Sequence, residues 1–298
     1  MPKQNIDGVL LLDKPVGLSS NAALQHARRL LEAARAGHTG TLDPRASGLL
    51  ALCFGEATKF ASGLLDADKA YRARVRLGVR TATGDAEGEV LERREVRAGR
   101  DQILAVLERF RGEIEQVPPM HSAIKHQGRP LYAYARKGQT IERKPRQVLI
   151  RELELLRMDG ADFDLRVLCS KGTYIRTLAE DIGAALGCGA HLAALERTAI
   201  GPFRLADAIG LEAFAALPGQ ERYGRLLPVT VLIQSQPRVV VDAEAETRFR
   251  HGQAVGAGAE RGSVGVFAAD GSFLGLGEIG ADGRLHPKRL MSLPQKAA

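Results

Sequence analysis

A strictly alternating segment near residue 75 places the tightest limit on how this chain can fold. From Tyr71 to Val79 the sequence reads YRARVRLGV, in which apolar side chains alternate with arginines. Successive side chains of a β-strand point to opposite faces, so this segment predicts a strand with one buried face and one basic face. A strand of this kind needs a sheet with a packed core on one side.

Further strands and helices can be placed before and after this segment. Two apolar runs, over 8–13 and over 49–54, predict two buried strands, and Pro15 ends the first of them. Apolar residues at helical spacing after Ser19 predict a helix that extends to Gly37. A turn at 83–85 and a strand near 89–93 predict a hairpin with the alternating strand. Strands are expected over 147–157 and 162–169, before a helix that starts at Thr173.

The chain changes in composition near 234–237, where a polar segment contains proline. Beyond it, strand-like segments at 239–241, 264–268 and 272–276 are accompanied by Asp-Gly turns at 270–271 and 282–283. We therefore expect a small, all-β C-terminal domain over about residues 238–298.

The overall composition bounds the class of protein. The 298 residues include 42 Lys and Arg against 35 Asp and Glu, a net charge of +7, which favours a polyanion partner: nucleic acid first and a membrane surface second. Charge alone does not decide the matter, because many basic proteins bind neither. No apolar run approaches the roughly 18 residues of a membrane span, and the N-terminus predicts no secretory signal. The three cysteines are too few for a disulfide scaffold, which predicts a reducing, cytoplasmic location.

The segment GHTGTLDPRASG at 37–48 is the most informative motif for chemistry. Its three glycines permit backbone shapes that side chains forbid, and Pro44 biases Asp43 away from helical geometry. A carboxylate held on a rigid turn beside His38 suits nucleophilic or acid–base work. A plain turn in which Asp43 caps a following helix is the alternative, and the residues alone leave both interpretations open.

Two other segments carry candidate site residues. In SKGTYIR at 170–176 a strand leads through a glycine turn into a helix, so Tyr174 and Arg176 would project from the end of a sheet. The alternative has Arg176 paired with Glu180 on the helix surface. Tyr71 begins the alternating strand, where a tyrosine is usually a core residue on β-propensity alone.

Residues 112–146 differ in character from the rest of the chain. They are basic and rich in turn residues, with Tyr132 and Tyr134 among the charges. A long insertion of this kind in a compact domain is usually functional.

Taken together, these segments resemble the TruB-type tRNA pseudouridine synthases, a family that modifies uridine 55 in the TΨC loop of tRNA. The resemblance runs from GVLLLDKP at 8–15 to about Arg197, and it includes AGHTGTLDP at 36–44, GEATK at 55–59, SKGTYIRT at 170–177 and GCGAH at 187–191. Separated motifs in the same order argue against a chance match. Thr41 and Ser47 stand where many bacterial members carry alanine and threonine; both are small, and neither is assigned a role.

The resemblance implies an α+β pseudouridine synthase fold, with a catalytic domain over residues 1–235 built on a curved, mostly antiparallel mixed sheet that has a central cleft and flanking helices. Residues 238–298 resemble the PUA-type RNA-binding module of the family in length, position and strand pattern. The basic insertion at about 112–146 corresponds to the RNA-binding thumb of the family.

The resemblance also implies the chemistry, in which the C1′–N1 bond of uridine breaks and the uracil turns and rejoins through C5. Asp43 corresponds to the nucleophile, and attack at C1′, attack at C6 and deprotonation of the sugar all stay open. Arg176 corresponds to its partner, and Tyr71 to a residue that stacks on the base and is a candidate to remove the C5 proton. Tyr174 and Leu195 correspond to the uracil pocket, and His38 to the histidine that fills the vacated stack. No cofactor and no metal ion are implied, since nothing is oxidised, transferred or hydrolysed.

Two other functions stay open for a chain of this pattern. One is a non-catalytic RNA-binding or tRNA-chaperone protein of the same fold, although binding alone requires none of Asp43, Tyr71 and Arg176. The other is an enzyme of the family that acts on rRNA or snRNA with guide partners, which the lack of charged low-complexity tails disfavours. We expect a monomer that acts on the T-arm of tRNA without an obligatory protein partner.

Overall fold

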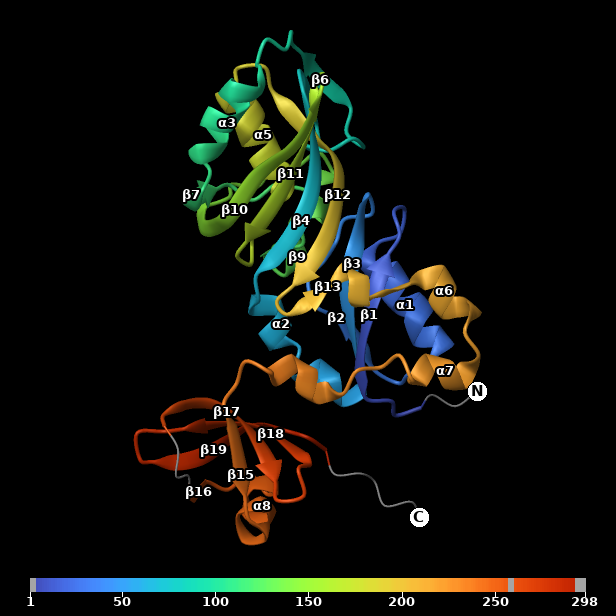
Figure 1. Ribbon diagram of the computed structural model, residues 1–298, viewed down its shortest axis with the longest axis vertical. Coiled ribbons are helices and arrows are strands. Elements are labelled where there is room, and N and C mark those ends of the chain that lie inside the picture. Colours follow the sequence, from blue (N-terminus) through green and yellow to red (C-terminus); the bar gives the residue numbers. More distant parts are fainter. Residues whose placement is uncertain (1–3, 257–259, 293–298) are drawn as a thin grey trace.

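The computed structural model describes residues 4–256 and 260–292, and a ten-stranded mixed sheet forms its largest part (Figure 1). Across the sheet, the strands follow in the order β14 (Ile209–Gly210), β1 (Gly8–Lys14), β3 (Ala46–Phe54), β12 (Ala190–Ile200), β4 (Lys69–Leu77), β11 (Asp162–Cys169), β10 (Arg146–Asp159) and β7 (Gly112–Gln116). Two short strands, β2 (Ala36–His38) and β13 (Phe203–Arg204), pair with β3 and β12. The β1–β14 and β3–β12 pairs are parallel and the other pairs are antiparallel, which confirms the predicted mixed, mostly antiparallel sheet.

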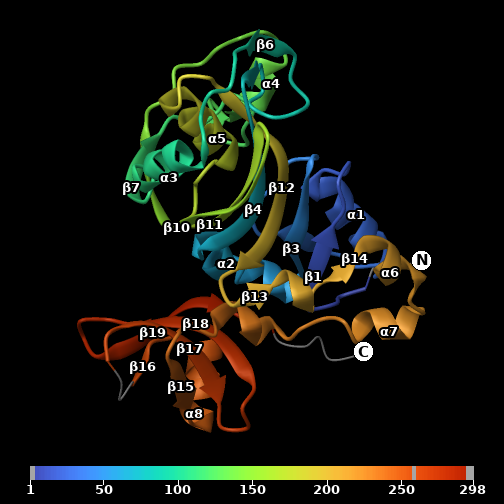
Figure 2. The ribbon, with the colours of Figure 1, turned by 45° about the horizontal axis from the view of Figure 1, so that its top comes forward.

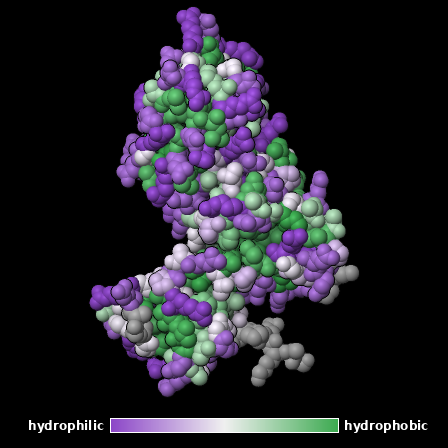
Figure 3. Space-filling view, in the orientation of Figure 1, coloured by the Kyte–Doolittle hydropathy of each residue, from purple (hydrophilic) through white to green (hydrophobic). Residues whose placement is uncertain are grey.

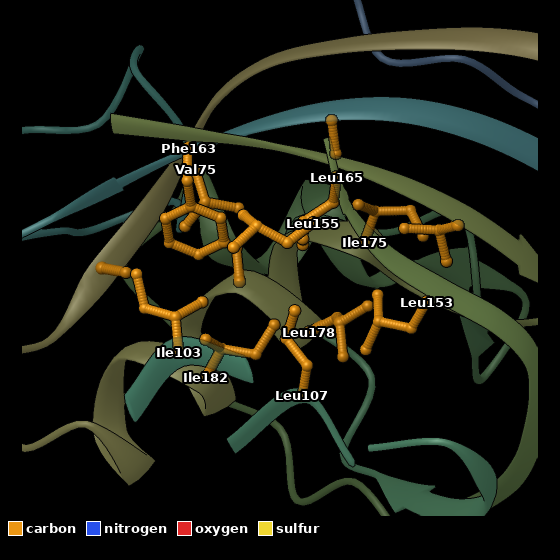
Figure 4. Packing of buried hydrophobic residues seen from close by; sticks show 14 of the residues in the cluster. Val75, Ile103, Leu107, Leu153, Leu155, Phe163, Leu165, Ile175, Leu178 and Ile182 are labelled. Atoms are coloured by element: carbon orange, nitrogen blue, oxygen red, sulfur yellow. The ribbon is translucent and has the colours of Figure 1, made fainter. Parts of the chain in front are cut away.

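One half of the sheet packs against two helices, α3 (Arg100–Glu108) and α5 (Ile175–Ala185). Figure 4 shows Val75, Phe163 and Leu165 of the strands facing Ile103 and Ile182 of the helices. Each of these side chains is at most 1% exposed, so the helices and the inner sheet face form one dry core.

The other half of the sheet is covered on both faces. In β3, Leu50, Leu52 and Phe54 pack toward α1 (Ser20–Leu30) and α6 (Leu211–Ala216), while Leu49 and Ala51 pack toward η1 (Gly55–Lys59) and η3 (Val229–Ile233). Burial on both sides explains why this strand reads as a continuous apolar run rather than an alternating one. The helices α2 (Ser62–Asp66) and α7 (Gly219–Tyr223) and the turn η2 (Leu205–Asp207) complete this half.

The alternating strand is confirmed as β4, and its basic face has partners. Ala73, Val75 and Leu77 are buried, and the arginines between them are exposed. Across the strand pair, Arg74 forms a two-point ion pair with Asp164 and Arg76 forms one with Asp162, both on β11. The predicted basic face is therefore largely neutralised by carboxylates of the neighbouring strand.

Several predicted element ends are wrong for local reasons. The alternating strand ends at Leu77, because Gly78 (φ +78°) turns the chain into β5 (Val79–Thr81), and it is β5 that pairs with β6 (Val90–Arg93). The helix predicted to reach Gly37 ends at Leu30, since Glu32 takes a left-handed conformation and the Ala33 N–H donates back to the Arg28 carbonyl. The helix expected from Thr173 begins at Ile175.

The basic insertion is shorter than predicted. Its first residues, Gly112–Gln116, form β7 of the main sheet. Residues 117–145, which we call the thumb, contain the hairpin β8 (Lys125–His126) with β9 (Arg129–Pro130) and the helix α4 (Leu131–Ala135).

A separate five-stranded sheet follows the linker, in the order β15 (Arg238–Val241), β17 (Gly262–Ala268), β18 (Phe273–Ile279), β19 (Arg284–Leu290) and β16 (Val255–Gly256) (Figure 2). The small C-terminal β domain is thus confirmed, but the all-β prediction was wrong: α8 (Ala243–Arg250), capped by Asp242, packs Phe249 into its core. Residues 257–259 and 293–298 of the predicted range 238–298 lie outside the described residues.

The C-terminal sheet contacts the rest of the chain through apolar side chains and a small ion-pair group. Phe60 packs edge-on against Phe273, with ring centroids 5.2 Å apart. Lys59 Nζ lies 2.7 Å from Glu56 Oε2 and donates to the Leu290 carbonyl at 3.2 Å. Figure 3 shows hydrophilic residues over much of the upper lobe and hydrophobic ones near this junction.

In the described ranges no helix is long and apolar enough to cross a membrane.

Candidate active site

The loop that carries Asp43 connects β2 to β3 and is held from three sides. The buried Ser20 hydroxyl of α1 accepts from the Leu42 N–H at 2.7 Å and donates to the Leu42 carbonyl at 2.9 Å. The Gly17 N–H donates to the Pro44 carbonyl at 2.8 Å, and Arg197 donates to the Gly40 carbonyl at 3.1 Å. β3, not a helix, follows at Ala46, so Asp43 does not cap a helix. The loop instead presents its carboxylate, 41% exposed, to a cavity.

Arg176 is the partner of Asp43. It lies at the second position of α5, its side chain is 6% exposed, and its Nε is 3.0 Å from Asp43 Oδ2. Its two terminal nitrogens donate to the carbonyls of Thr83 at 3.2 Å and of His121, in the thumb, at 2.6 Å. The guanidinium therefore aims its charge at Asp43 rather than at Glu180, and the alternative of a surface helix pair was wrong.

A cavity of about 280 Å³ brings most of the predicted site residues together. Its lining includes Asp43, Tyr71, Tyr174, Arg176 and Leu195. Tyr71 comes from β4 and Leu195 from β12, the two strands that pair at the centre of the sheet. Burial raises the pKa values of the Tyr71 and Tyr174 hydroxyls, so each is neutral at pH 7.

His38 lies in an adjoining cavity of about 520 Å³ that also reaches Asp43 and Arg176. Burial, aided by Arg197, lowers the pKa of His38, which keeps its ring neutral. Its buried Nδ1 has no hydrogen-bond partner in the part of the chain that the structure describes. Two thumb residues, Tyr132 and Arg136, line the same cavity, and the Arg136 guanidinium lies 5.4 Å from the Tyr132 ring centroid.

Several residues that sequence reasoning missed support this site. Asp85 Oδ2 lies 3.9 Å from Arg176 Nε. The buried Gln116 amide accepts from the Tyr174 N–H at 3.0 Å and donates to the Tyr174 carbonyl at 3.3 Å. Arg197 is 1% exposed within β12. A charged residue inside an otherwise strand-like run was the signal for Arg197; Asp85 and Gln116 gave none, because turns and strand ends commonly carry such residues.

The site holds buried cations besides Arg197. Lys14 Nζ donates to the carbonyls of Pro15 and Leu18, and Lys69 Nζ donates to three carbonyls between Leu64 and Ala67. Burial lowers the pKa of each to about 8. Among the described residues, no group of three or more His, Cys, Asp and Glu side chains is placed to hold a metal ion.

Comparison with known proteins gives the same family along nearly the whole chain. The N-terminal domain profile of the TruB family pseudouridylate synthases matches residues 28–175, the tRNA pseudouridylate synthase B C-terminal domain matches 176–231, and the C-terminal domain of pseudouridine synthase II TruB matches 237–291. The tRNA pseudouridine synthase B of Burkholderia mallei (strain NCTC 10247) is 56% identical over 299 residues, covering 98% of this chain and 99% of its relative. That of Chromobacterium violaceum is 55% identical over 294 residues, covering 97% and 96%.

Solved structures share the fold. A Cbf5-Nop10-Gar1 complex contains a chain that is 30% identical, with a TM-score of 0.71, covering 91% of this chain and 78% of that one. An H/ACA RNP bound to a substrate RNA containing 2′-deoxyuridine contains another that is 25% identical, with a TM-score of 0.72, covering 96% and 85%. With its Asp43 cavity, its mixed sheet and relatives of this identity over nearly its full length, the chain belongs to the TruB family of pseudouridylate synthases.

Proposed function

We propose that this chain converts uridine 55 of tRNA to pseudouridine in the cavity beside Asp43, and that Asp43 is the nucleophile. The observation that carries the proposal is the placement of an arginine-paired carboxylate in a cavity of about 280 Å³, which has room for one pyrimidine base between Tyr71, Tyr174 and Leu195. A cavity of this kind suits a base that has been taken out of its stack.

Asp43 acts as an ionised carboxylate. The Arg176 guanidinium pairs with this carboxylate at 3.0 Å, and its remaining contacts to two main-chain carbonyls hold it in that position. From the loop, the carboxylate can attack C1′ of the ribose or C6 of the uracil, or take a proton from the sugar. All three routes begin with the same ionised group.

Tyr71 stacks on the target base and removes the C5 proton. The Tyr71 hydroxyl first gives its proton to water. After the C1′–N1 bond has broken and C5 has joined C1′ in place of N1, the phenolate takes the proton from C5, and the C5–H electron pair forms the C5=C6 bond. The π electrons of the N1=C6 double bond, which formed when C5 bonded to C1′, move to N1, and N1 takes a proton from water. Atoms and charge balance without an oxidant or a group donor, so this chemistry requires no cofactor.

Binding of the RNA requires the target uridine to leave the folded loop, at a cost of a few kcal/mol. The neutral His38 ring, in the cavity next to Asp43, fills the vacated stack. Exposed cations on the thumb, among them Lys125, Arg129 and Arg136, contact phosphates of the T-arm.

The domains divide the task in this proposal. Residues 1–235 carry the catalytic site, and residues 238–298, of which 257–259 and 293–298 lie outside the described residues, form a PUA-like RNA-binding module. The protein acts as a monomer in the cytoplasm, without an obligatory protein partner. The three cysteines Cys53, Cys169 and Cys188 are free and buried, which suits a reducing compartment.

The test is an in vitro reaction of the purified protein with an unmodified tRNA transcript, followed by pseudouridine mapping. We expect product at uridine 55 and none from Asp43→Asn, which should still bind tRNA. Asp159→Asn, an equivalent change at an exposed carboxylate, is the control and should leave the rate unchanged. Appreciable product from Asp43→Asn would exclude the nucleophile role. Product at a position outside the T-loop would correct the substrate, and RNA binding with no product would favour the non-catalytic RNA-binding or chaperone function.

A further inference from the structure

Arg197 occupies an unusual position for a charged side chain. It lies in β12 near the centre of the main sheet, is 1% exposed, and pairs across the strands directly with Tyr71 of β4. Burying an ionised group is expensive unless its environment compensates for the loss of water. A charge retained at this depth, opposite a tyrosine of the site, calls for an explanation in terms of the reaction.

The hydrogen bonds of Arg197 hold its guanidinium in place without neutralising it. Nε donates to the Leu49 carbonyl of β3 at 2.7 Å, and Nη2 donates to the Gly40 carbonyl of the Asp43 loop at 3.1 Å. Main-chain carbonyls are dipoles without net charge, so these contacts supply no counter-ion at the wall of the cavity, which Arg197 helps to line. Burial lowers the pKa of Arg197, but an arginine titrates so far above pH 7 that the guanidinium stays charged. The contacts also fix its distance from the loop.

The ionisable groups around Tyr71 act on its hydroxyl in opposite directions. Burial raises the pKa of Tyr71; Arg197, which pairs with Tyr71 across β12 and β4, lowers it, while Cys169 on β11 and Asp43 on its loop raise it further. Lys14 of β1 and Lys69 of β4 lie near enough to Arg197 to repel it, which adds to the positive potential on this side of the cavity.

We propose that Arg197 is a positioning residue for the reaction, one that holds the Tyr71 phenol in the cavity and stabilises the phenolate that forms before it takes the C5 proton. The inference rests on the proposed role of Tyr71. A preorganised charge aimed at the place where negative charge develops is an effective form of electrostatic catalysis. Arg197 does this through Tyr71 and has no need to touch the substrate.

The experiment is a direct titration of Tyr71. The chain has no Trp and five Tyr, so tyrosinate absorbance at 295 nm, with the Tyr71→Phe protein subtracted, follows Tyr71 without interference from indole. The titration is made on wild type, Arg197→Gln and Arg197→Lys. For the same proteins, single-turnover rates on a tRNA transcript are measured between pH 7 and 9.5, and tRNA binding is measured as well. Gln keeps an N–H donor but loses the charge, whereas Lys keeps the charge but loses the planar fork.

We expect Arg197→Gln to move the Tyr71 titration upward by about one pH unit or more, the range that a nearby opposite charge accounts for. Its rate should fall about ten-fold or more at pH 7.5 and recover in part at pH 9.5. Arg197→Lys should move the titration less than half as far. Arg222→Gln is the matched control, because Arg222 also donates to two main-chain carbonyls, those of Leu30 and Ala215, and lines neither cavity beside Asp43.

The proposal is overturned if Arg197→Gln titrates like wild type, or if Gln and Lys shift the titration equally. A rate loss that is the same at every pH would likewise reduce Arg197 to a structural tie between β12 and β3. Should Arg197→Gln fail to fold, the neutral Arg197→Met is measured in its place. If neither folds, Arg197→Lys decides: a shift of one pH unit in the Tyr71 titration with the charge retained would refute the proposal, and a shift of less than half a unit would uphold it. A near-normal rate for Tyr71→Phe would remove the base role of Tyr71 but leave the measured Arg197–Tyr71 coupling standing.

Discussion

Replacing Gly48 with alanine tests whether the close parallel pairing of β3 with β12 sets the geometry of the site. Gly48 pairs with Arg197 and has φ +99°, a left-handed conformation. A Cβ at this position would lie 2.4 Å from the Arg197 carbonyl oxygen and 2.8 Å from its nitrogen. Both are main-chain atoms, so no side-chain rotation relieves the overlap. The two strands must move apart instead.

The expected loss of stability in Gly48→Ala is the sum of two costs, that of the left-handed conformation and that of the main-chain overlap. The left-handed conformation costs about 1–2 kcal/mol for a residue with a Cβ. Ordinary contact begins near 3.4 Å, so the overlap requires the strands to separate by about 1 Å at Arg197. With the hydrogen bonds that this separation strains, we expect a total loss of about 3–5 kcal/mol in the free energy of unfolding. Displacing Arg197 and Leu195 by that distance should also lower the rate about 100-fold.

The assay is urea unfolding together with single-turnover pseudouridine formation, with Gly112→Ala as the control. Gly112 also has a left-handed φ, +84°, but an added Cβ there meets nothing within 4 Å. It therefore reports the conformational term alone, about 1–2 kcal/mol. If Gly48→Ala proves no less stable than Gly112→Ala and keeps its rate, the reasoning about the β3–β12 contact is wrong.

Four further changes test individual contacts. Tyr71→Phe should keep tRNA binding and lose the rate of product formation by about 100-fold or more, as for other general bases; a near-normal rate would leave Tyr71 with stacking alone. Arg176→Lys should lower the rate at least ten-fold, because a point charge cannot reach Asp43 and two carbonyls together, and an unchanged rate would show that the pair is dispensable. Gln116→Leu leaves the Tyr174 N–H and carbonyl unpaired and should cost about 1–3 kcal/mol in urea unfolding, with a higher KM for tRNA; a wild-type KM would contradict a role in holding Tyr174. Burial lowers the pKa of Lys14 to about 8. Between this pH and the ordinary lysine pKa the unfolded chain binds more protons than the folded chain, so the free energy of unfolding of the wild type should rise by about 2 kcal/mol relative to Lys14→Met between pH 7.5 and 9.5. Urea unfolding at both pH values measures this difference, and a constant difference would refute the burial argument.

Local patterns predicted the elements that depend on local physics. The alternation in β4 and the apolar run of β3 follow from which faces are buried, and both strands were found where they were expected. Element ends were predicted less well. The end of α1 depends on a left-handed residue at Glu32, and α8 depends on packing of Phe249 under a sheet that forms far along the chain. Propensity alone does not reveal such long-range packing.

The six predicted site residues come from four separated segments, and the structure places all of them around two adjoining cavities. The motifs that carry the family resemblance include four of these residues, so the sequence pointed to them before their geometry was known. Asp85, Gln116 and Arg197 escaped notice because their importance lies in what they touch. A glutamine at the end of a strand looks ordinary until its amide pairs with the Tyr174 main chain.

By itself the sequence indicated the family and its reaction and pointed to Asp43 as the proposed nucleophile, because these are carried by short motifs whose residue types the chemistry requires. The tertiary structure alone decided how the charges are arranged. Arg72, Arg74 and Arg76 looked like a basic surface, but all three pair with carboxylates of β11. Arg197 looked like one more charge in a strand, yet it is buried beside Tyr71. Electrostatic effects depend on distance and burial, and both are set by strand pairing between residues far apart in the chain, 86 positions for Arg76 and Asp162 and more than 100 for Tyr71 and Arg197.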